Sequence, residues 1–481
     1  MRPLRRLSCL LLIVLWSGLV AAQPADVRVR LFGTSAPDAV AISGAGTVVI
    51  DGLRAGQTTR GAISQVERHG SRVRISGGGV EGEGLSVELA PDTPGSTLHV
   101  VSGRQTVDVI GPVTCVLTGD AFLIVNRVPL PNYVSSVVAS EYGFSEIEGV
   151  KAQAILARTY AVRQAAASRR AYDVDDHQGS QVYRGTGVET ETSRRAERET
   201  RSQILTYGGQ PAEALYSSSS GGHTADNETI WGTTPLPYLR GVPDPYDAAA
   251  PDHTWQTSAD AARVRGVLSR RYGGTVTGIE IAERSREGRV VRVRVIGSRE
   301  TVISGSDFRT VINGTLGWRT VRSTLFSLSL VGDQYVLTGG GFGHGVGMSQ
   351  YGARAQARAG RTYLEILSFY FAGTQVTGGN APLLALERPA SERPTARPPA
   401  TPQSARPPSA QAPAGGVPPT ARPPAAPPRR NQGEAIVLRP PPTAVPTAAP
   451  TARQPSAPAA LPTATEGARW PTPPRAPRSG W

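Results

Sequence analysis

The final part of this 481-residue chain is too rich in proline to form a hydrophobic core. Residues 377–481 contain 27 of the 41 prolines, mixed with Ala, Thr and Arg and with almost no aromatic residues. Such a segment cannot bury enough apolar surface to offset the loss of chain entropy on folding. We therefore predict a disordered tail over 377–481, serving as a spacer or as a surface-adhering segment, and expect the fold to be built from the residues before it.

The N-terminus has the pattern of a secretory signal. A basic region precedes an apolar stretch and small residues suited to cleavage: Arg2, Arg5 and Arg6, then residues 7–19, then Val20-Ala21-Ala22. We predict a signal peptide over 1–22 and a mature protein that starts at Gln23. The alternative is an uncleaved membrane anchor, although the apolar stretch is slightly short for a membrane-spanning helix.

The net charge of +13 is concentrated outside the part expected to fold. Twelve Arg and three Glu after residue 387 account for +9, and the three N-terminal Arg add +3. The rest of the chain is close to neutral, so it offers no basic face and we expect no nucleic-acid partner. Beyond the signal, Cys115 is the single cysteine, which excludes an internal disulfide and predicts a small buried hydrophobe.

The hydrophobic pattern changes from strand-like to helix-like near residue 130. Short runs separated by Gly, Asp and Pro predict strands over residues 24–128: VRVRLF, VAIS, TVVIDG, RVRISG, LSVEL, LHVVSG and FLIVN. Helices are predicted over 131–143, 145–169, 189–201 and 349–371. Further strands are predicted at ILTYGG, AEALYS, VTGIEIAERS, VVRVRVIGS, FSLSLVG and YVLTGG. The fold class is α+β, with a β-rich N-terminal part packed with a mixed helix and sheet core.

Two predicted helices have recognisable boundaries. Pro131 suits the first turn of its helix, and Gly143 suits the C-terminal cap. Ser145 and Glu148 have the spacing of a capping box at the start of the next helix.

One carboxylate interrupts the apolar face of the first helix. Val134, Val137 and Val138 mark that face, and helical spacing places Glu141 on it, at the C-terminal end of the helix. Burial and the helix dipole both raise a carboxyl pKa, which is what a general acid requires. The structural alternative is an edge glutamate bonded to Lys151 or Arg158.

Two glycine-rich stretches surround polar side chains. GFGHGVGMSQYGA (341–353) places His344 among four glycines, and SSSSGGHT (217–224) is a polar turn. Glycine permits positive φ and close backbone approach, so each stretch suits either a plain turn or a turn beneath a ligand.

Seven long motifs follow one another over roughly residues 105–375: LIVNRVPLPNYVSSVVASEYG, EGVKAQAILARTYAV, SQVYRG, ALYSSSSGGHTADNETIWG, YLRGVPDPYD, GFGHGVGMSQYGARAQARAG and YLEILSFYFAG. In their sequence and their order they resemble the motifs of the SpoIID/LytB family, which comprises stage II sporulation protein D and the amidase enhancers. We therefore divide the chain into a signal peptide (1–22), a β-rich region (23–104), a SpoIID/LytB-like catalytic core (105–376) and the tail (377–481). One local departure is Pro131-Asn132, where relatives often have an acidic pair.

The resemblance implies a peptidoglycan lytic transglycosylase that acts in the periplasm, in the cell wall or outside the cell. Glu141 would protonate the oxygen between N-acetylmuramic acid and N-acetylglucosamine, and would then take a proton from the muramic acid's primary hydroxyl. The product would be a 1,6-anhydro ring, so no second carboxylate would be needed to activate water. The expected substrate-binding residues are Lys151, Arg158, Tyr183, Ser219, Ser220, His223, Thr224, His344 and Gln350, with Trp255 as a further stacking candidate.

Metal binding is not expected. Histidines and acids such as His177 and Asp175 lack the spacing of a zinc motif, and Ser180 stands where some relatives have a cysteine ligand. We therefore predict no cofactor, which also disfavours a zinc amidase or peptidase. A second hypothesis remains: as in the amidase enhancers, the chain would bind glycan strands without cutting them and would act on a partner cell-wall amidase.

Overall fold

The computed structural model describes residues 23–379. The predicted signal peptide lies outside the described residues, as does the predicted tail from residue 380 onward. Among the described residues, no helix combines the length and the apolar character needed to cross a membrane. Strands and helices are both abundant, so the α+β prediction is confirmed.

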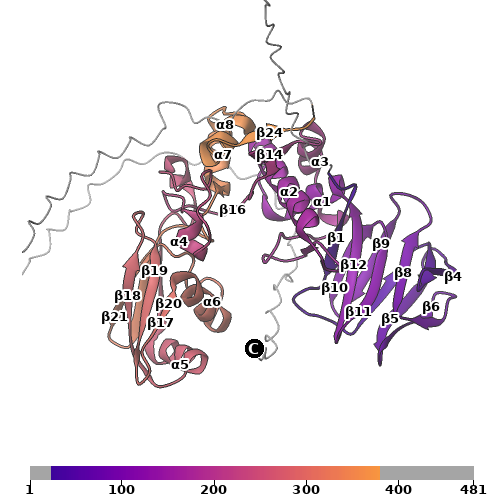
Figure 1. Cartoon of the computed structure of the whole chain (residues 1–481), viewed down its shortest axis with the longest axis horizontal. Coiled ribbons are helices and arrows are strands. Elements are labelled where there is room, and N and C mark those ends of the chain that lie inside the picture. Colours follow the sequence, from indigo (N-terminus) through magenta and orange to yellow (C-terminus); the bar gives the residue numbers. More distant parts are fainter. Residues whose placement is uncertain (1–22, 380–481) are drawn as a thin grey trace, which may run out of the picture. The chain divides into compact units, whose positions relative to one another are not determined.

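The N-terminal strands form two antiparallel sheets (Figure 1). The first sheet has the order β13-β1-β12-β11-β8-β3-β4, in which only the short β13 pairs in parallel, with β1. Its strands are β1 (Asp26–Leu31), β3 (Gly46–Ile50), β4 (Leu53–Thr58), β8 (Ser86–Pro91), β11 (Val113–Thr118), β12 (Ala121–Pro129) and β13 (Val174–Asp175). The second, in the order β10-β9-β2-β5-β6-β7, contains β2 (Ala39–Ser43), β5 (Ile63–His69), β6 (Arg72–Gly77), β7 (Gly82–Gly84), β9 (Thr97–Ser102) and β10 (Gln105–Ile110).

The strands bury alternate side chains, as the period-two pattern predicts. In β1, Val27, Val29 and Leu31 are buried while the residues between them are half-buried. Cys115 in β11 is buried in the same core, and this burial raises the pKa of its thiol to about 12. The sheets continue through β12, so strand pairing runs past residue 104, where the sequence placed a boundary.

Helix α1 (Leu130–Glu141) follows β12 directly, and α2 (Ile147–Ala167) packs against it. The predicted capping box at the start of α2 is wrong, because Glu148 instead bonds to Lys151 Nζ at 2.8 Å and accepts the backbone N–H of Tyr363. Gly143 is likewise not the cap of α1; Tyr142 occupies that position.

Helix α2 is buried among the other helices because small side chains line it. Ala152, Ala154, Ala157 and Ala161 are all fully buried, which lets neighbouring helices approach closely. Its neighbours are α1, α3 (Glu191–Glu199), α7 (Gln350–Arg358) and α8 (Tyr363–Tyr370).

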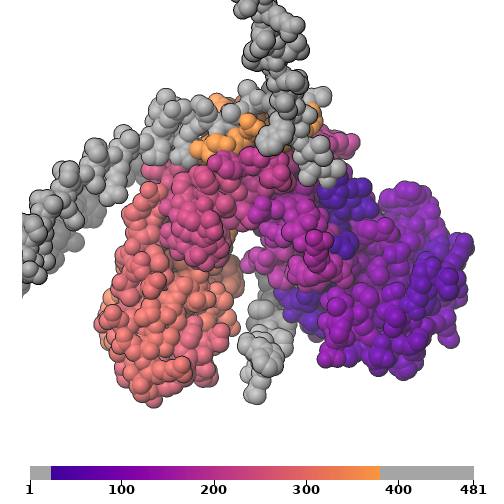
Figure 2. Space-filling model, viewed as in Figure 1, coloured from indigo at the N-terminus to yellow at the C-terminus, as the bar shows by residue number. Residues whose placement is uncertain are grey.

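The predicted last helix, 349–371, is two helices rather than one. Gly360 adopts a positive φ after α7, and Thr362 starts α8 with a capping box to Glu365. The end of the described chain then pairs with its middle, because β24 (Gln375–Thr377) joins β14 (Ile204–Tyr207), which also pairs with β15 (Gln210–Pro211). In Figure 2 the orange C-terminal residues accordingly adjoin magenta surface from the middle of the chain.

Residues 255–339 have their own hydrophobic core, around Trp255, Phe308 and Phe326. Two three-stranded sheets, β17-β22-β21 and β18-β19-β20, pack with two helices that the sequence did not predict, α5 (Ala261–Tyr272) and α6 (Gly305–Leu316). The strands are β17 (Trp255–Asp260), β18 (Val276–Arg284), β19 (Val290–Gly297), β20 (Thr301–Ser304), β21 (Phe326–Val331) and β22 (Gln334–Gly339). The remaining elements are short: η1 (Thr186–Val188), β16 (Tyr216–Ser217), α4 (Asn227–Trp231), η2 (Pro245–Ala249) and β23 (Met348–Ser349).

Candidate active site

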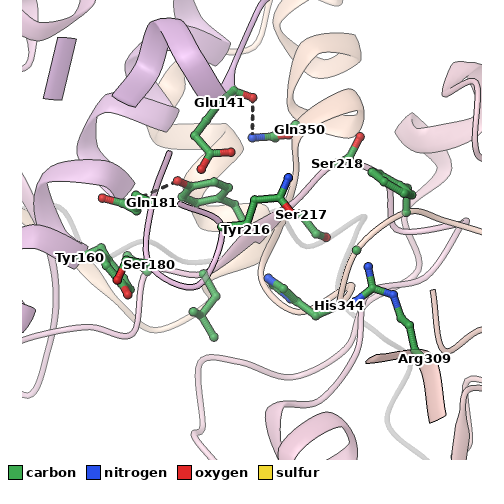
Figure 3. Close-up of a pocket in the computed structure, with 15 residues that line it drawn as sticks. Glu141, Tyr160, Ser180, Gln181, Tyr216, Ser217, Ser218, Arg309, His344 and Gln350 are labelled. Atoms are coloured by element: carbon green, nitrogen blue, oxygen red, sulfur yellow. Dashed lines mark hydrogen bonds between the residues drawn. The ribbon is translucent and has the colours of Figure 1, made fainter. Parts of the chain in front are cut away.

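Glu141 lies at the end of α1 and lines a cleft of about 330 Å³ (Figure 3). Its position follows from the helix pattern, because Val134, Val137 and Val138 bury the same face of α1 completely. The other cleft residues come from six separate stretches of the chain: Tyr160; Gln178, Ser180 and Gln181; Ala214 to Ser218; Arg309; Phe342 to His344; and Gln350. Among the described residues that line this cleft, Glu141 is the sole carboxylate.

Two hydrogen bonds hold Glu141 in place, one through its side chain and one through its backbone. Its side-chain Oε1 accepts the backbone N–H of Val182 at 2.7 Å, and its backbone carbonyl accepts Gln350 Nε2 at 3.0 Å. Burial raises the pKa of Glu141, while the Val182 N–H and the charge of Arg184 act in the opposite direction. A half-buried carboxyl with a raised pKa is suited to holding a proton that it can donate.

Each residue of the segment 181–184 makes a hydrogen bond to α1 or to residues close to it. Gln181 accepts Tyr133 Oη at 3.0 Å and donates to Tyr216 Oη at 3.1 Å, while the backbone N–H of Arg184 bonds to Ser136 Oγ at 3.3 Å. This segment therefore sets the place of the Val182 N–H against the Glu141 carboxyl.

The serine-rich turn contributes a different pair of hydroxyls from the predicted one. Ser217 and Ser218 line the cleft, whereas Ser219 and Ser220 are buried beneath it. Ser219 Oγ donates to Asp247 at 2.7 Å, and Ser220 Oγ donates to Asp244 at 3.0 Å. Ser219 and Ser220 thus hold the turn rather than face the cleft.

Asp247 is the centre of this buried network, with no exposed surface. Its carboxylate accepts the hydroxyls of Ser219 (2.7 Å) and Ser349 (2.8 Å), the backbone N–H groups of Ser220 (3.0 Å) and Gly221 (2.9 Å), and lies 3.0 Å from His253 Nδ1. Nearby, burial and the Asp247 charge raise the pKa of Asp244 to about 7.

His344 lines the cleft, as the glycine-rich stretch suggested. Its Nδ1 accepts the backbone N–H of Val346 at 3.0 Å, and its ring lies against Trp231, with centroids 5.2 Å apart. Burial, together with the nearby charges of Arg309 and Arg289, lowers the pKa of His344 to about 4, so the ring is neutral near pH 7.

The glycines around His344 are required by the backbone. Gly341, Gly343, Gly345 and Gly347 all adopt positive φ, between 74° and 104°. A Cβ at Gly345 would also collide with the buried guanidinium of Arg289.

Two cations that the sequence offered for substrate binding, Lys151 and Arg158, lie outside the cleft. Lys151 Nζ bonds to Glu148 at 2.8 Å and Glu199 at 2.6 Å, and the buried Arg158 pairs with Glu197 at 3.4 Å. Both cations therefore tie α2 to its neighbours, because glutamates on the same helix and on α3 neutralise them. Neither cation contacts Glu141. The alternative, in which Glu141 is an edge glutamate bonded to Lys151 or Arg158, is therefore wrong.

The other candidate residues are structural in this chain. Tyr183 is buried, stacks on Tyr133 and donates to Asn126 at 3.0 Å. His223 Nδ1 lies 2.7 Å from the Thr224 carbonyl, and the buried Thr224 accepts the Val242 N–H. Trp255 is buried and donates to the Gly341 carbonyl at 2.9 Å. Of the predicted binding residues, His344 and Gln350 remain at the cleft.

Three residues line the cleft although the sequence did not indicate them: Tyr216, Gln181 and Arg309. Gln181 and Tyr216 stand within motifs that had been noted, but no local pattern distinguished them. Arg309 lies on a helix that had not been predicted. Within residues 23–379, no group of three or more His, Cys, Asp or Glu side chains is placed to hold a metal ion.

Comparison with known proteins gives two model matches and several relatives. The family model described as Stage II sporulation protein matches residues 118–207, and a domain of unknown function matches residues 253–347. Stage II sporulation protein D of Bacillus subtilis (strain 168) is 34% identical over 315 residues, covering 62% of this chain and 88% of the relative. The same protein of Bacillus amyloliquefaciens is 33% identical over 298 residues, covering 58% and 83%. The amidase enhancer of Bacillus subtilis (strain 168) is 29% identical over 279 residues, covering 48% of this chain and 38% of the enhancer.

Proposed function

The chain belongs to the stage II sporulation protein D family, and on this premise we propose that it is a peptidoglycan lytic transglycosylase with Glu141 as its general acid and base. The observation that carries the proposal is a cleft in which Glu141 is the sole carboxylate among the described lining residues. The predicted signal peptide of the chain would export the protein, so that it could reach the cell wall.

The proposed reaction uses one carboxyl twice. Protonated Glu141 gives its proton to the oxygen between N-acetylmuramic acid and N-acetylglucosamine. The bond from that oxygen to C1 of the N-acetylmuramic acid then breaks. The primary hydroxyl on C6 of the muramic acid then attacks C1, and its proton passes to the Glu141 carboxylate. The cycle leaves a 1,6-anhydro ring and restores the protonated acid.

The number of carboxylates distinguishes this reaction from hydrolysis. A glycoside hydrolase ordinarily needs a second carboxylate, either to activate water or to attack the sugar. In the lytic reaction the nucleophile already belongs to the substrate, and the enzyme needs only to orient it. Gln181, Tyr216 and Gln350 supply uncharged polar groups around Glu141 that suit this orienting role.

Product analysis tests the proposal. The purified full chain would be incubated with glycan strands lacking stem peptides and with intact sacculi, and the products would be read by mass spectrometry. We expect anhydromuramyl ends on at least one of these substrates. Reducing ends instead would indicate a hydrolase and refute the single-carboxyl mechanism.

A second candidate function is that of a glycan-binding enhancer of a cell-wall amidase. It is favoured by the similarity to a relative named an amidase enhancer, although this chain covers only 38% of that relative. Absence of any cleavage, combined with retention of the chain on glycan and faster release of stem peptides by an added amidase, would favour this function over the first.

The pH dependence of cleavage is expected to report the pKa of Glu141. Because the reaction starts from the protonated carboxyl, kcat/KM should decline as pH rises through that pKa, which burial holds above its ordinary value of 4.5. Arg184→Gln removes a positive charge that lowers this pKa, so the decline should move to higher pH. Kinetics across pH 4–9 would check this, with Arg195→Gln on the exposed face of α3 as the matched control. A shift to lower pH in Arg184→Gln would contradict the assignment.

A further inference from the structure

Arg309 is an arginine of the cleft that has no acidic partner among the described residues. It lies on α6, and its Nε donates to the backbone carbonyls of Val321 at 3.2 Å and Arg322 at 3.3 Å. Its two Nη groups make no hydrogen bond or ion pair within residues 23–379. The side chain is therefore anchored at Nε while the rest of its hydrogen-bonding edge is unused.

Two other half-buried arginines among the described residues have acidic partners. Arg322 pairs with Asp252, and Arg240 pairs with Glu228. Burial lowers the pKa of Arg309, and no acid acts in the opposite direction. A cation held partly out of water without a counter-charge is costly, and an anionic ligand would remove that cost.

The surroundings of Arg309 favour an anion that is part of the substrate. Figure 3 shows Arg309 beside His344 in the cleft that Glu141 also lines. His344 is neutral near pH 7, so it carries no positive charge that would compete with Arg309 for a carboxylate. Glu141 belongs to the same cleft, but the two groups form no ion pair.

We propose that Arg309 is a binding site for a carboxylate of peptidoglycan, accepted by the free edge of its guanidinium. This inference rests on the proposed glycan substrate. Two sources share the chemistry: the lactyl carboxylate of N-acetylmuramic acid and the carboxylates of an attached stem peptide. A planar guanidinium suits either one, because its parallel N–H groups match the two carboxylate oxygens. The site also gives a role to residues 253–347, which match a domain of unknown function.

Binding measurements without turnover test the role of Arg309. The parent protein would be the full chain carrying Glu141→Gln, and the ligand a tetrasaccharide of alternating N-acetylglucosamine and N-acetylmuramic acid with free lactyl carboxylates. We expect the parent to bind this acid form about tenfold more tightly than the same tetrasaccharide with carboxamides. Arg309→Gln in the parent should abolish the preference, and Arg309→Lys should restore part of it.

A third ligand distinguishes the two sources. In a tetrasaccharide that carries stem peptides, the lactyl group is an amide and the only carboxylates are those of the peptide. An Arg309-dependent gain with this ligand but none with the lactyl acid would assign the site to the stem peptide.

The matched control is Asn313→Ala on the same helix. Asn313 holds the same loop as Arg309, since its side chain exchanges two hydrogen bonds of 2.9 Å with the backbone of Val321. Asn313→Ala should weaken the loop and leave the carboxylate preference intact. Loss of the preference in Asn313→Ala to the same extent would show that Arg309 acts only through the loop.

Besides that outcome of the control, three results would overturn the inference: equal affinity of the parent for acid, amide and peptide forms, an unchanged preference in Arg309→Gln, or no measurable binding of any carboxylate form. Cleavage by the wild-type chain is scored separately. If the wild-type chain forms anhydro ends but the parent binds acid and carboxamide forms equally, the proposed role of Arg309 is refuted and the proposed function is not.

Discussion

Replacing Glu141 by glutamine is expected to reduce the rate of glycan cleavage about 10³-fold, within the range typical of losing a general acid. Glutamine has nearly the same shape and retains an oxygen that can accept the Val182 N–H, so the cleft should keep its structure. The amide cannot donate a proton to the glycosidic oxygen or receive one from the muramic acid hydroxyl. The loss should therefore appear in kcat, with little change in glycan affinity.

Glu146→Gln is the matched control for this substitution. Glu146 lies five residues further on but faces Arg354 and Arg358 outside the cleft. We expect its cleavage rate to remain within about twofold of wild type, since the substitution removes no group from the cleft and glutamine can still accept hydrogen bonds from the two arginines. Rates would be measured from the appearance of anhydromuramyl ends, with thermal melting to confirm folding. Cleavage by Glu141→Gln at a tenth of the wild-type rate or more would remove Glu141 from the acid and base role.

Replacing Asp247 by alanine is expected to lower the free energy of unfolding by about 4 kcal/mol, because several buried donors would lose their shared acceptor at once. These donors come from the serine-rich turn and from the start of α7: the hydroxyls of Ser219 and Ser349 and the N–H groups of Ser220 and Gly221. Ser219, Ser220 and Ser349 are buried like Asp247 itself, so bulk water does not reach these three residues. Cleavage should also decline, because Ser217 and Ser218 of the same turn line the cleft.

Urea unfolding of the wild type and the variant would measure this loss. Asp92→Ala is a suitable control, because Asp92 is exposed and accepts a single bond, from Thr47 at 3.1 Å. Its effect should be no more than about 0.5 kcal/mol. A loss below about 1.5 kcal/mol in Asp247→Ala would mean that the turn does not depend on this carboxylate.

Local patterns predicted much of the secondary structure. The alternation of β1 and the apolar stripe of α1 are each set by neighbours along the chain, and both were confirmed. Helix ends were less well predicted, because other partners, both near and distant in sequence, compete for the capping groups. Glu148 illustrates this, since Lys151 and the backbone of Tyr363 engage its carboxylate in place of the expected cap.

Local patterns also indicated part of the candidate site, whereas other contacts of the predicted residues depend on distant helices. Helical spacing placed Glu141 on the apolar stripe of its helix and left an edge glutamate as the alternative, and the family resemblance implied its role as an acid. The glycines around His344 likewise indicated a special turn, since positive φ is a local requirement. The ion pairs of Lys151 and Arg158 depend on α3, whose Glu199 and Glu197 lie more than thirty residues further along the chain.

Periodicity therefore determined which residues of β1 and α1 would be buried, because the buried face follows from the geometry of a single helix or strand. Which polar groups meet was decided by the tertiary structure alone. Ser219 reaches Asp247, Gln350 reaches the end of α1, and Arg309 reaches the cleft from a helix that the sequence had not indicated. Charge pairing and hydrogen bonding act over a few ångströms in space, and separation along the chain carries no record of those distances.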